Sequence, residues 1–334
     1  MTRSGSIVRV VDGSEVSTAR RMATQCAQQL GLSETVAAKA ALIATELATN
    51  LVKHGGGGSI LFGSDDEPPA LTMTAFDKGG GIANVGLAMR DGHSTTGSPG
   101  TGLGAIQRAA TSFDVFTSDK GTVLVCRIAD ESSRVQAGLA PPRITLGGIN
   151  LAKPSETEPG DAWTAMIGRD VATIAVVDGL GHGPAAALAA NAAIRVFREG
   201  EAHELERLLN DAHAALRATR GAAVGIARIF AAQGRVDFVG VGNIAGAVID
   251  DASTRRVVSQ NGIVGHEMRR VQTFSYPWTA SSVLVLQSDG VSASWNESAY
   301  PGLMNREPAL IAAVLYRDFC RGTDDATVVV AKAS

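Results

Sequence analysis

Hydrophobic and polar positions along the N-terminal third alternate between the helical and the strand period. A short β-branched strand is followed by two stretches in which apolar residues recur every three to four positions: residues 7–11, 14–30 and 36–52. Ser33 stands just before the second helix, where a serine side chain can accept a hydrogen bond from an unpaired N–H group. Further apolar runs predict four more strands and one short helix: residues 59–62, 70–76, 113–117, 122–128 and 103–110. This order of elements indicates two long helices on one face of a mixed sheet.

The middle of the chain changes character before a second structured region begins. Residues 129–142 are first charged, then small, and end in two prolines, which is typical of a linker between domains. Beyond them, many short apolar runs indicate strands, and three longer periodic runs indicate helices: residues 184–197, 203–216 and 308–319. We therefore predict an α+β chain with a first domain at 1–129, a linker at 130–143 and a layered sandwich of sheets and helices at 144–334.

Composition narrows the class of protein. The chain has 334 residues, a formal net charge of −3, no cluster of basic residues and three widely spaced cysteines. These features predict neither a nucleic-acid nor an anionic-membrane partner, and they favour reduced thiols over disulfides or a zinc site. We find neither an apolar run long enough to span a bilayer nor a secretory segment, so we expect a cytoplasmic protein.

A glycine-rich stretch from Ala75 to Leu103 carries the first candidate chemistry. Asp77 ends an apolar strand and can accept a hydrogen bond from a ligand amine such as that of adenine. Dense glycines let the backbone approach a ligand closely and offer N–H groups to phosphate, and the second group stands where a helix begins. A glycine run by itself is more often a turn, and the second group does not match the dinucleotide-binding pattern GxGxxG. The two groups are Gly79, Gly80 and Gly81, and Gly100, Gly102 and Gly104.

The preceding helix supplies a partner for these glycines. Glu46 and Asn50 are four residues apart and therefore share one helical face. A carboxylate there can activate a nucleophile, and an amide oxygen can bind Mg²⁺. Either residue alone is typical of a solvated helix face. The presence of both glycine groups downstream favours a site for a magnesium–nucleotide complex.

Three segments resemble the boxes of the GHKL ATPases. ELATN at 46–50 resembles the N box, DKGGGI at 77–82 the G1 box and GTGLG at 100–104 the G2 box. The spacing and the segment DGHSTTGS resemble the RsbT-type switch kinases, which phosphorylate Ser or Thr on STAS-domain regulators. The resemblance covers residues 5–128 and implies ATP with Mg²⁺. It implies Glu46 as base and Asn50 as Mg²⁺ ligand, and assigns nucleotide binding to Asp77, Gly79, Gly81, Gly100, Thr101, Gly102, Leu103 and Gly104.

Four acids in the second region stand at strand ends or in tight loops. Carboxylates that follow apolar strands meet at one edge of a sheet, where they can bind hard divalent cations. Two such ions can activate water for attack at phosphorus. An acid after a strand more often caps a helix or closes a turn, but four in one domain favour a metal cluster. The four acids are Asp161, Asp178, Asp289 and Asp324.

The order of their motifs, GD, DGLGHG, SDG and DDAT, resembles the PPM-type metal-dependent Ser/Thr phosphatases of the SpoIIE and RsbX branch. By this resemblance, which covers residues 144–332, Asp178 bridges two Mg²⁺ or Mn²⁺ ions and the Gly179 carbonyl contributes through water. The other three acids complete the coordination shells of the two ions. His182 is a candidate acid or base, although a structural role beside Gly183 is favoured. Arg143 is a candidate phosphate-binding arginine.

Together the two regions predict a partner-switching regulator of the stress-response type. The first would phosphorylate Ser or Thr of a STAS-domain partner with ATP, and the second would dephosphorylate the same or a related partner. Dimerisation or domain contacts through the linker would set which activity dominates. Two alternatives remain: a phosphatase regulated by an ATP- or partner-binding GHKL domain without catalysis, and a binding regulator similar to an anti-sigma factor.

Overall fold

The computed structural model describes residues 3–66, 68–90, 102–130, 143–200, 202–269 and 271–334, which form two compact units. Unit 1 comprises Met1–Leu139 and Asn305–Asp318, and unit 2 comprises Ala140–Met304 and Phe319–Ser334. The chain therefore leaves unit 2 for one segment and then returns to it.

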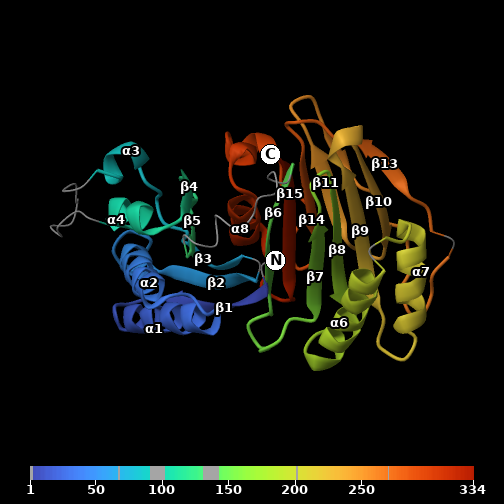
Figure 1. The fold of residues 1–334 in the computed structure, drawn as a ribbon, viewed down its shortest axis with the longest axis horizontal. Helices are drawn as coiled ribbons and strands as arrows, with labels where there is room; N and C mark the ends of the chain where they lie inside the picture. The colour runs from blue at the N-terminus through green and yellow to red at the C-terminus, as the bar shows by residue number, and fades with distance from the viewer. Residues whose placement is uncertain (1–2, 67, 91–101, 131–142, 201, 270) are drawn as a thin grey trace. The chain divides into compact units, whose positions relative to one another are not determined.

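Unit 1 contains a five-stranded sheet with the order β1-β2-β3-β5-β4 (Figure 1). The fold class is α+β as predicted, but the expected mixed sheet is antiparallel in each of its four described pairings. Short connections join β2 to β3 and β4 to β5, and a short connection between neighbouring strands forces them to run in opposite directions. The strands are β1 (Arg3–Val10), β2 (Gly58–Asp66), β3 (Pro69–Phe76), β4 (Ser112–Ser118) and β5 (Gly121–Ala129).

Helices pack against this sheet through small and branched side chains. The Ser33 side chain caps α2 by accepting a hydrogen bond from the Val36 N–H at 3.4 Å. Alanines on α1 and α2 are fully buried, which allows the two helices to approach each other closely. The helices are α1 (Ser14–Gln29), α2 (Glu34–His54), the single turn α3 (Val85–Ala88) and α4 (Gly102–Ala109). Their shared core includes Ala23, Ala40, Ile43, Leu47, Ile60, Leu71, Met73, Ile106 and Ile128.

Most of a distant helix, α8 (Pro308–Phe319), also belongs to unit 1. Within that unit the Tyr316 ring lies 5.7 Å from the Phe76 ring in an edge-on arrangement. Just before the helix, Arg306 forms an ion pair with Asp114 at 3.2 Å, and the Glu307 N–H donates to the same carboxylate at 2.9 Å. α8 is apolar on nearly all sides, and such a helix is stable only when it is buried all round.

Unit 2 is built on two five-stranded sheets, β13-β10-β9-β8-β7 and β12-β11-β14-β15-β6, and each pairing within them is antiparallel. The strands of the first sheet are β7 (Asp161–Ile167), β8 (Val171–Gly179), β9 (Ala222–Phe230), β10 (Arg235–Val241) and β13 (Phe274–Pro277). Those of the second are β6 (Ile144–Leu151), β11 (Ala245–Ile249), β12 (Thr254–Arg256), β14 (Val283–Gln287) and β15 (Ala326–Ala333). Three short 3-10 helices lie at Ala231–Gln233, Glu297–Ala299 and Leu303–Asn305.

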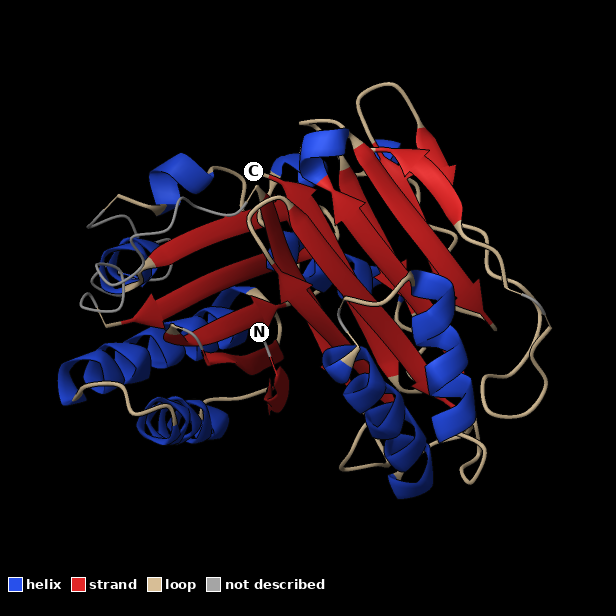
Figure 2. Ribbon diagram, turned by 45° about the vertical axis from the view of Figure 1, so that its right-hand side comes forward, coloured by secondary structure: helices blue, strands red, loops and turns tan. Residues whose placement is uncertain are grey.

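Strand β8 faces two hydrophobic cores, which explains its continuous apolar sequence. Ile174 and Val176 belong to the core between the sheets, whereas Ala175 and Val177 belong to the core under α6 and α7. Successive side chains of a strand point to opposite faces, so a strand between two layers needs apolar residues at every position. Helices α6 (Pro184–Glu199) and α7 (Leu205–Ala215) lie side by side on the outer face of this sheet (Figures 1 and 2).

One helix among the described residues, α2, is long and apolar enough to cross a membrane by length and composition alone. Half of its apolar window is buried within the protein. A buried core helix passes the same criterion, so this finding is weak evidence for a membrane segment.

Candidate functional site

The antiparallel arrangement of unit 2 brings the four predicted acids to one edge of its two sheets. Asp161 begins β7 and is the cross-strand partner of Asp178, near the end of β8. Asp289 follows β14, and Asp324 precedes β15, which pairs with β14 in the antiparallel sense. Because the end of one antiparallel strand lies beside the start of the next, acids far apart in the sequence converge.

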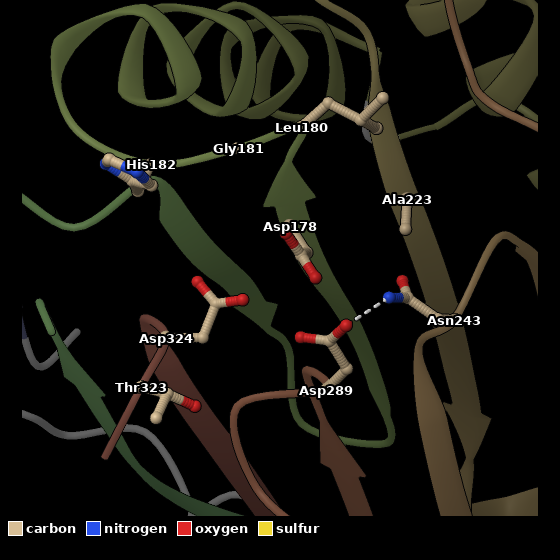
Figure 3. Close-up of a pocket in the computed structure, with 9 residues that line it drawn as sticks. All are labelled: Asp178, Leu180, Gly181, His182, Ala223, Asn243, Asp289, Thr323 and Asp324. Carbon is tan, nitrogen blue, oxygen red and sulfur yellow. Dashed lines mark hydrogen bonds between the residues drawn. The ribbon is translucent and has the colours of Figure 1, made fainter. Parts of the chain in front are cut away.

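Three of these acids line one cavity of about 270 Å³ (Figure 3). The carboxylates of Asp178, Asp289 and Asp324 come from three separate loops or strand ends and point toward a common space. Asp178 and Asp324 are 146 residues apart in the sequence, so it is the fold that brings these carboxylates together. The other lining residues are Leu180, Gly181, His182, Ala223, Asn243 and Thr323.

Asp161 is buried and is not one of the residues that line this cavity. It is 4% exposed, and its carboxylate accepts a hydrogen bond of 2.6 Å from the Ser288 hydroxyl. Ser288 immediately precedes Asp289, so this bond connects the two acidic segments. Gly179 is also absent from the lining: its N–H donates to the Gly160 carbonyl at 3.2 Å.

Burial and mutual repulsion perturb three of the four acids. Burial, followed by repulsion from neighbouring aspartates, raises the pKa of Asp178 to about 8. Burial also raises the pKa of Asp161 to about 7, against the lowering effect of the Ser288 hydrogen bond. The pKa of Asp289 is raised for the same main reason, burial. A carboxylate cluster of this kind is stabilised by a bound cation, because the cation neutralises the repulsion.

Two polar residues that sequence analysis missed organise the cluster. The Asn243 amide donates to the Asp289 carboxylate at 2.6 Å and lines the same cavity. Asp325, which is 2% exposed, accepts hydrogen bonds from the N–H groups of Lys153 and Gly160 and so fixes the segment before Asp161. The doubled acid in DDAT was the available signal for Asp325. No sequence signal distinguished Asn243, since its contact depends on the loop after β10.

His182 stands at the rim of the cavity and is oriented by a carboxylate. Its Nδ1 lies 2.7 Å from Glu156 Oε1, and its side chain is 53% exposed. The Glu156 carboxylate also lies over Gly183, because a Cβ added there would come within 2.9 Å of it. The pair therefore fixes the loop in front of α6 while it leaves the second ring nitrogen, Nε2, available for a proton.

The donor set suits a hard divalent cation, which prefers carboxylate and carbonyl oxygens. Across the described residues, no group of three or more His, Cys, Asp or Glu side chains already has the arrangement of a metal site. The convergence of three lining carboxylates and the raised pKa of Asp178 nevertheless fit an ion bound with the help of water. We therefore regard the residues present as compatible with Mg²⁺ or Mn²⁺.

In unit 1, Asp77 lies at the centre of the glycine-rich segment. Its Oδ1 accepts hydrogen bonds from the Gly79 N–H at 2.8 Å and the Thr122 N–H at 3.1 Å. Among the described residues none donates to Oδ2, which is left for a ligand amine. Gly121 has a φ of +115°, and a Cβ there would lie 2.2 Å from the Asp77 carbonyl oxygen, so only glycine permits this approach.

Glu46 and Asn50 are half-buried on α2 and face the start of α4. A Cβ added at Gly102 would lie 3.5 Å from Asn50 Oδ1 and 3.7 Å from Glu46 Oε2. The N box and the second glycine group therefore meet, as the nucleotide hypothesis requires. Leu103 and Gly104 are buried in α4. Gly100 and Thr101, with the whole DGHSTTGS segment at 91–98, lie outside the described residues.

Comparisons with known families match two separate parts of the chain. Residues 11–128 match the histidine kinase-like ATPase domain family, and residues 169–334 match the stage II sporulation protein E (SpoIIE) family. The serine/threonine-protein kinase RsbT of Bacillus subtilis (strain 168) is 28% identical over 134 residues, which cover 40% of this chain and 93% of RsbT.

Two solved structures are similar to more than half of the chain. One, from work on the bacterial stressosome as a modular system adapted to control secondary messenger signalling, has 26% identity and a TM-score of 0.54. It covers 57% of this chain and 99% of its own. The other is the crystal structure of RsbX in complex with magnesium, with 19% identity and a TM-score of 0.54, over 59% of this chain and 98% of its own. The second likeness concerns the fold alone.

Proposed function

Because this chain joins a histidine kinase-like ATPase domain to a SpoIIE-type domain, we propose that it is a partner-switching enzyme with two opposed activities. Unit 2 removes phosphate from phosphoserine or phosphothreonine of a protein partner, and unit 1 transfers phosphate from ATP to such a partner. The observation that carries the proposal is the convergence of Asp178, Asp289 and Asp324 on one cavity.

In unit 2 the lining aspartates Asp178, Asp289 and Asp324 would hold Mg²⁺ or Mn²⁺. When bound, these ions would supply a water molecule activated for in-line attack on phosphorus. Asn243 keeps the Asp289 carboxylate oriented through its 2.6 Å hydrogen bond. The buried Asp161 is held by the hydrogen bond that it accepts from the Ser288 hydroxyl. His182, which Glu156 orients, would protonate the leaving oxygen.

In unit 1 the roles of the individual residues follow from the close approach of α2 to the start of α4. Glu46 would accept the proton of the attacking hydroxyl, and Asn50, whose amide oxygen lies close to Gly102, would hold Mg²⁺. Asp77 Oδ2 accepts a hydrogen bond from the adenine amino group. Such a site acts chiefly by positioning the phosphates and neutralising their charge, which glycine N–H groups and Mg²⁺ provide.

The partner that best fits this pair of domains is a STAS-domain phosphoprotein. RsbT is named as a serine/threonine-protein kinase, and one structural neighbour comes from work on the stressosome. A regulator that sets the phosphorylation of such a partner would need both directions of transfer under control. The futile hydrolysis of ATP would otherwise follow from two uncontrolled activities.

Two single-direction assays test the proposal. Unphosphorylated STAS-domain partner is incubated with ATP, Mg²⁺ and the Asp178→Asn variant, and phosphorylated partner is incubated with Mn²⁺ and the Glu46→Ala variant. We expect gain of phosphate in the first assay and loss in the second. Loss without gain would reduce unit 1 to an ATP- or partner-binding regulator.

The controls separate a wrong partner from a wrong function. A generic aryl phosphate with Mn²⁺ tests the chemistry of unit 2 without any protein partner. Hydrolysis of the aryl phosphate with neither partner reaction would mean that the partner is wrong. A different result would support a binding regulator instead. In that case all three reactions are absent, and the protein still forms a stable complex with its partner after both the Asp178→Asn and the Glu46→Ala substitution.

A further inference from the structure

The phosphatase activity proposed for unit 2 raises an electrostatic question about its substrate. A phosphate monoester brings up to two negative charges into a cavity lined by three carboxylates. Metal ions offset part of this charge, and an arginine at the rim can bind the remaining phosphate oxygens in a bidentate manner.

Arg143, the arginine that sequence analysis considered for this role, is in the wrong place. Its Nε forms an ion pair with Asp170 at 3.2 Å, at the turn between β7 and β8 that lies opposite the acidic edge. It also precedes β6, whose far end, Leu151, pairs with Ala326 close to Asp324. Eight residues of strand at about 3.3 Å each place Arg143 roughly 25 Å from the cavity.

Arg220, in contrast to Arg143, lies beside the lining of the cavity. A Cβ added at Gly181, a residue of the cavity lining, would lie 3.0 Å from Arg220 Nη1. The Arg220 side chain is exposed, and no residue in the described part of the chain forms a hydrogen bond or ion pair with it. An arginine without a protein partner at the edge of an acidic cavity keeps all five of its N–H donors for a ligand.

The backbone around Arg220 is held firmly to the cavity wall. The Leu180 N–H donates to the Gly221 carbonyl at 3.0 Å, which joins the loop after β8 to the loop before β9. Thr219 Oγ1 accepts from the Gly221 N–H at 3.0 Å, and the Thr219 carbonyl lies 3.1 Å from His266 Nε2. The Arg220 Cα is thus fixed, while its long side chain can turn toward the cavity.

We infer that Arg220 binds the phosphoryl group of the substrate at the rim of the carboxylate cavity. It acts by substrate binding, through the charge and the paired N–H donors of its guanidinium group. This assignment rests on the proposed phosphatase function of unit 2.

The test measures phosphate affinity and catalysis separately in the full-length chain. Inorganic phosphate is titrated calorimetrically into Mn²⁺-loaded wild type and Arg220→Ala, and aryl phosphate hydrolysis gives KM and kcat. We expect the Kd for phosphate and the KM to rise roughly tenfold to a hundredfold, with kcat changed less than about threefold, because a charged hydrogen-bond pair is lost. Arg220→Lys should recover part of the affinity.

Two matched arginines control the result. Arg217 lies in the same loop and is exposed, so Arg217→Ala should leave both constants unchanged. Arg321 lowers the pKa of Asp289 and is the rival candidate; a loss of phosphate affinity in Arg321→Ala but not in Arg220→Ala would overturn the inference. Manganese affinity measured by calorimetry should be the same in Arg220→Ala and wild type. Phosphate binding tests Arg220 even if wild type shows no turnover, which would instead count against the proposed function.

Discussion

Replacing Asp178 by asparagine should change how the stability of metal-free unit 2 depends on pH. Burial and neighbouring aspartates raise the pKa of Asp178 from 3.8 to about 8, so the folded state holds a proton that the unfolded chain has released. The stabilising effect of that proton is complete below about pH 4 and is lost as the pH rises toward about 8. An asparagine does not titrate, so the variant should lack this loss.

The size of the effect follows from proton linkage. One proton bound only by the folded state gives a slope of about 1.4 kcal/mol per pH unit. Between about pH 5 and pH 7 the wild type should therefore lose roughly 2 to 3 kcal/mol of unfolding free energy relative to Asp178→Asn. Asp161 also has a raised pKa and titrates together with Asp178, so part of the slope remains in the variant.

Tryptophan fluorescence measures this quantity for unit 2 alone, because the three tryptophans of the chain, Trp163, Trp278 and Trp295, all belong to that unit. Urea unfolding in EDTA at several pH values gives the free energies for wild type and variant. Asp251→Asn, at an exposed position, is the matched control and should follow the wild type. Parallel curves for wild type and Asp178→Asn, or a metal-free wild type that becomes more stable over this window, would refute the reasoning.

Three further predictions concern single contacts. Asn243→Ala removes the 2.6 Å bond to Asp289 and should weaken Mn²⁺ binding roughly tenfold to a hundredfold by calorimetry; unchanged affinity would mean that Asp289 does not bind the metal. Glu46→Gln should abolish phosphate transfer from ATP while a fluorescent nucleotide still binds, and retained transfer would exclude Glu46 as the base. Gly81→Ala should destabilise unit 1 by about 2 kcal/mol or more and weaken nucleotide binding, because Gly81 has a φ of +74° and a Cβ would lie 2.1 Å from the Ser118 carbonyl oxygen. Gly80→Ala, where a Cβ meets nothing within 4 Å, is its control in hydrogen-exchange measurements over β3 to β5, and equal effects of both substitutions would contradict the steric argument.

Sequence patterns were sufficient to predict the helices and strands whose hydrophobic periodicity is strong. The helix expected at 308–319 begins and ends at Pro308 and Phe319, and that expected at 14–30 ends one residue earlier. Strand β13 was missed, because only half of its residues are partly buried and its sequence, FSYP, ends in proline. Short edge strands of this kind carry little hydrophobic signal.

Candidate acids could be found from sequence because each one follows or precedes a strongly apolar strand. Their division into three lining carboxylates and a buried one could not be predicted, since it depends on the hydrogen bond that the Ser288 hydroxyl donates to the Asp161 carboxylate. Asn243 and Arg220 are placed by loop geometry alone. Neither residue belongs to a motif that can be recognised in a single sequence.

The membership of Asn305–Asp318 in unit 1 has a consequence for how the protein is made. A ribosome synthesises the rest of unit 1 first and then the whole of residues 140–304 before the partners of Asp114 and Phe76 on this segment emerge. Unit 1 therefore waits in an incomplete form while Asp161, Asp178 and Asp289 are translated. A chain that ends before Asn305 therefore lacks part of both units, and unit 2 is completed last, when Asp324 and β15 are translated after Asp318.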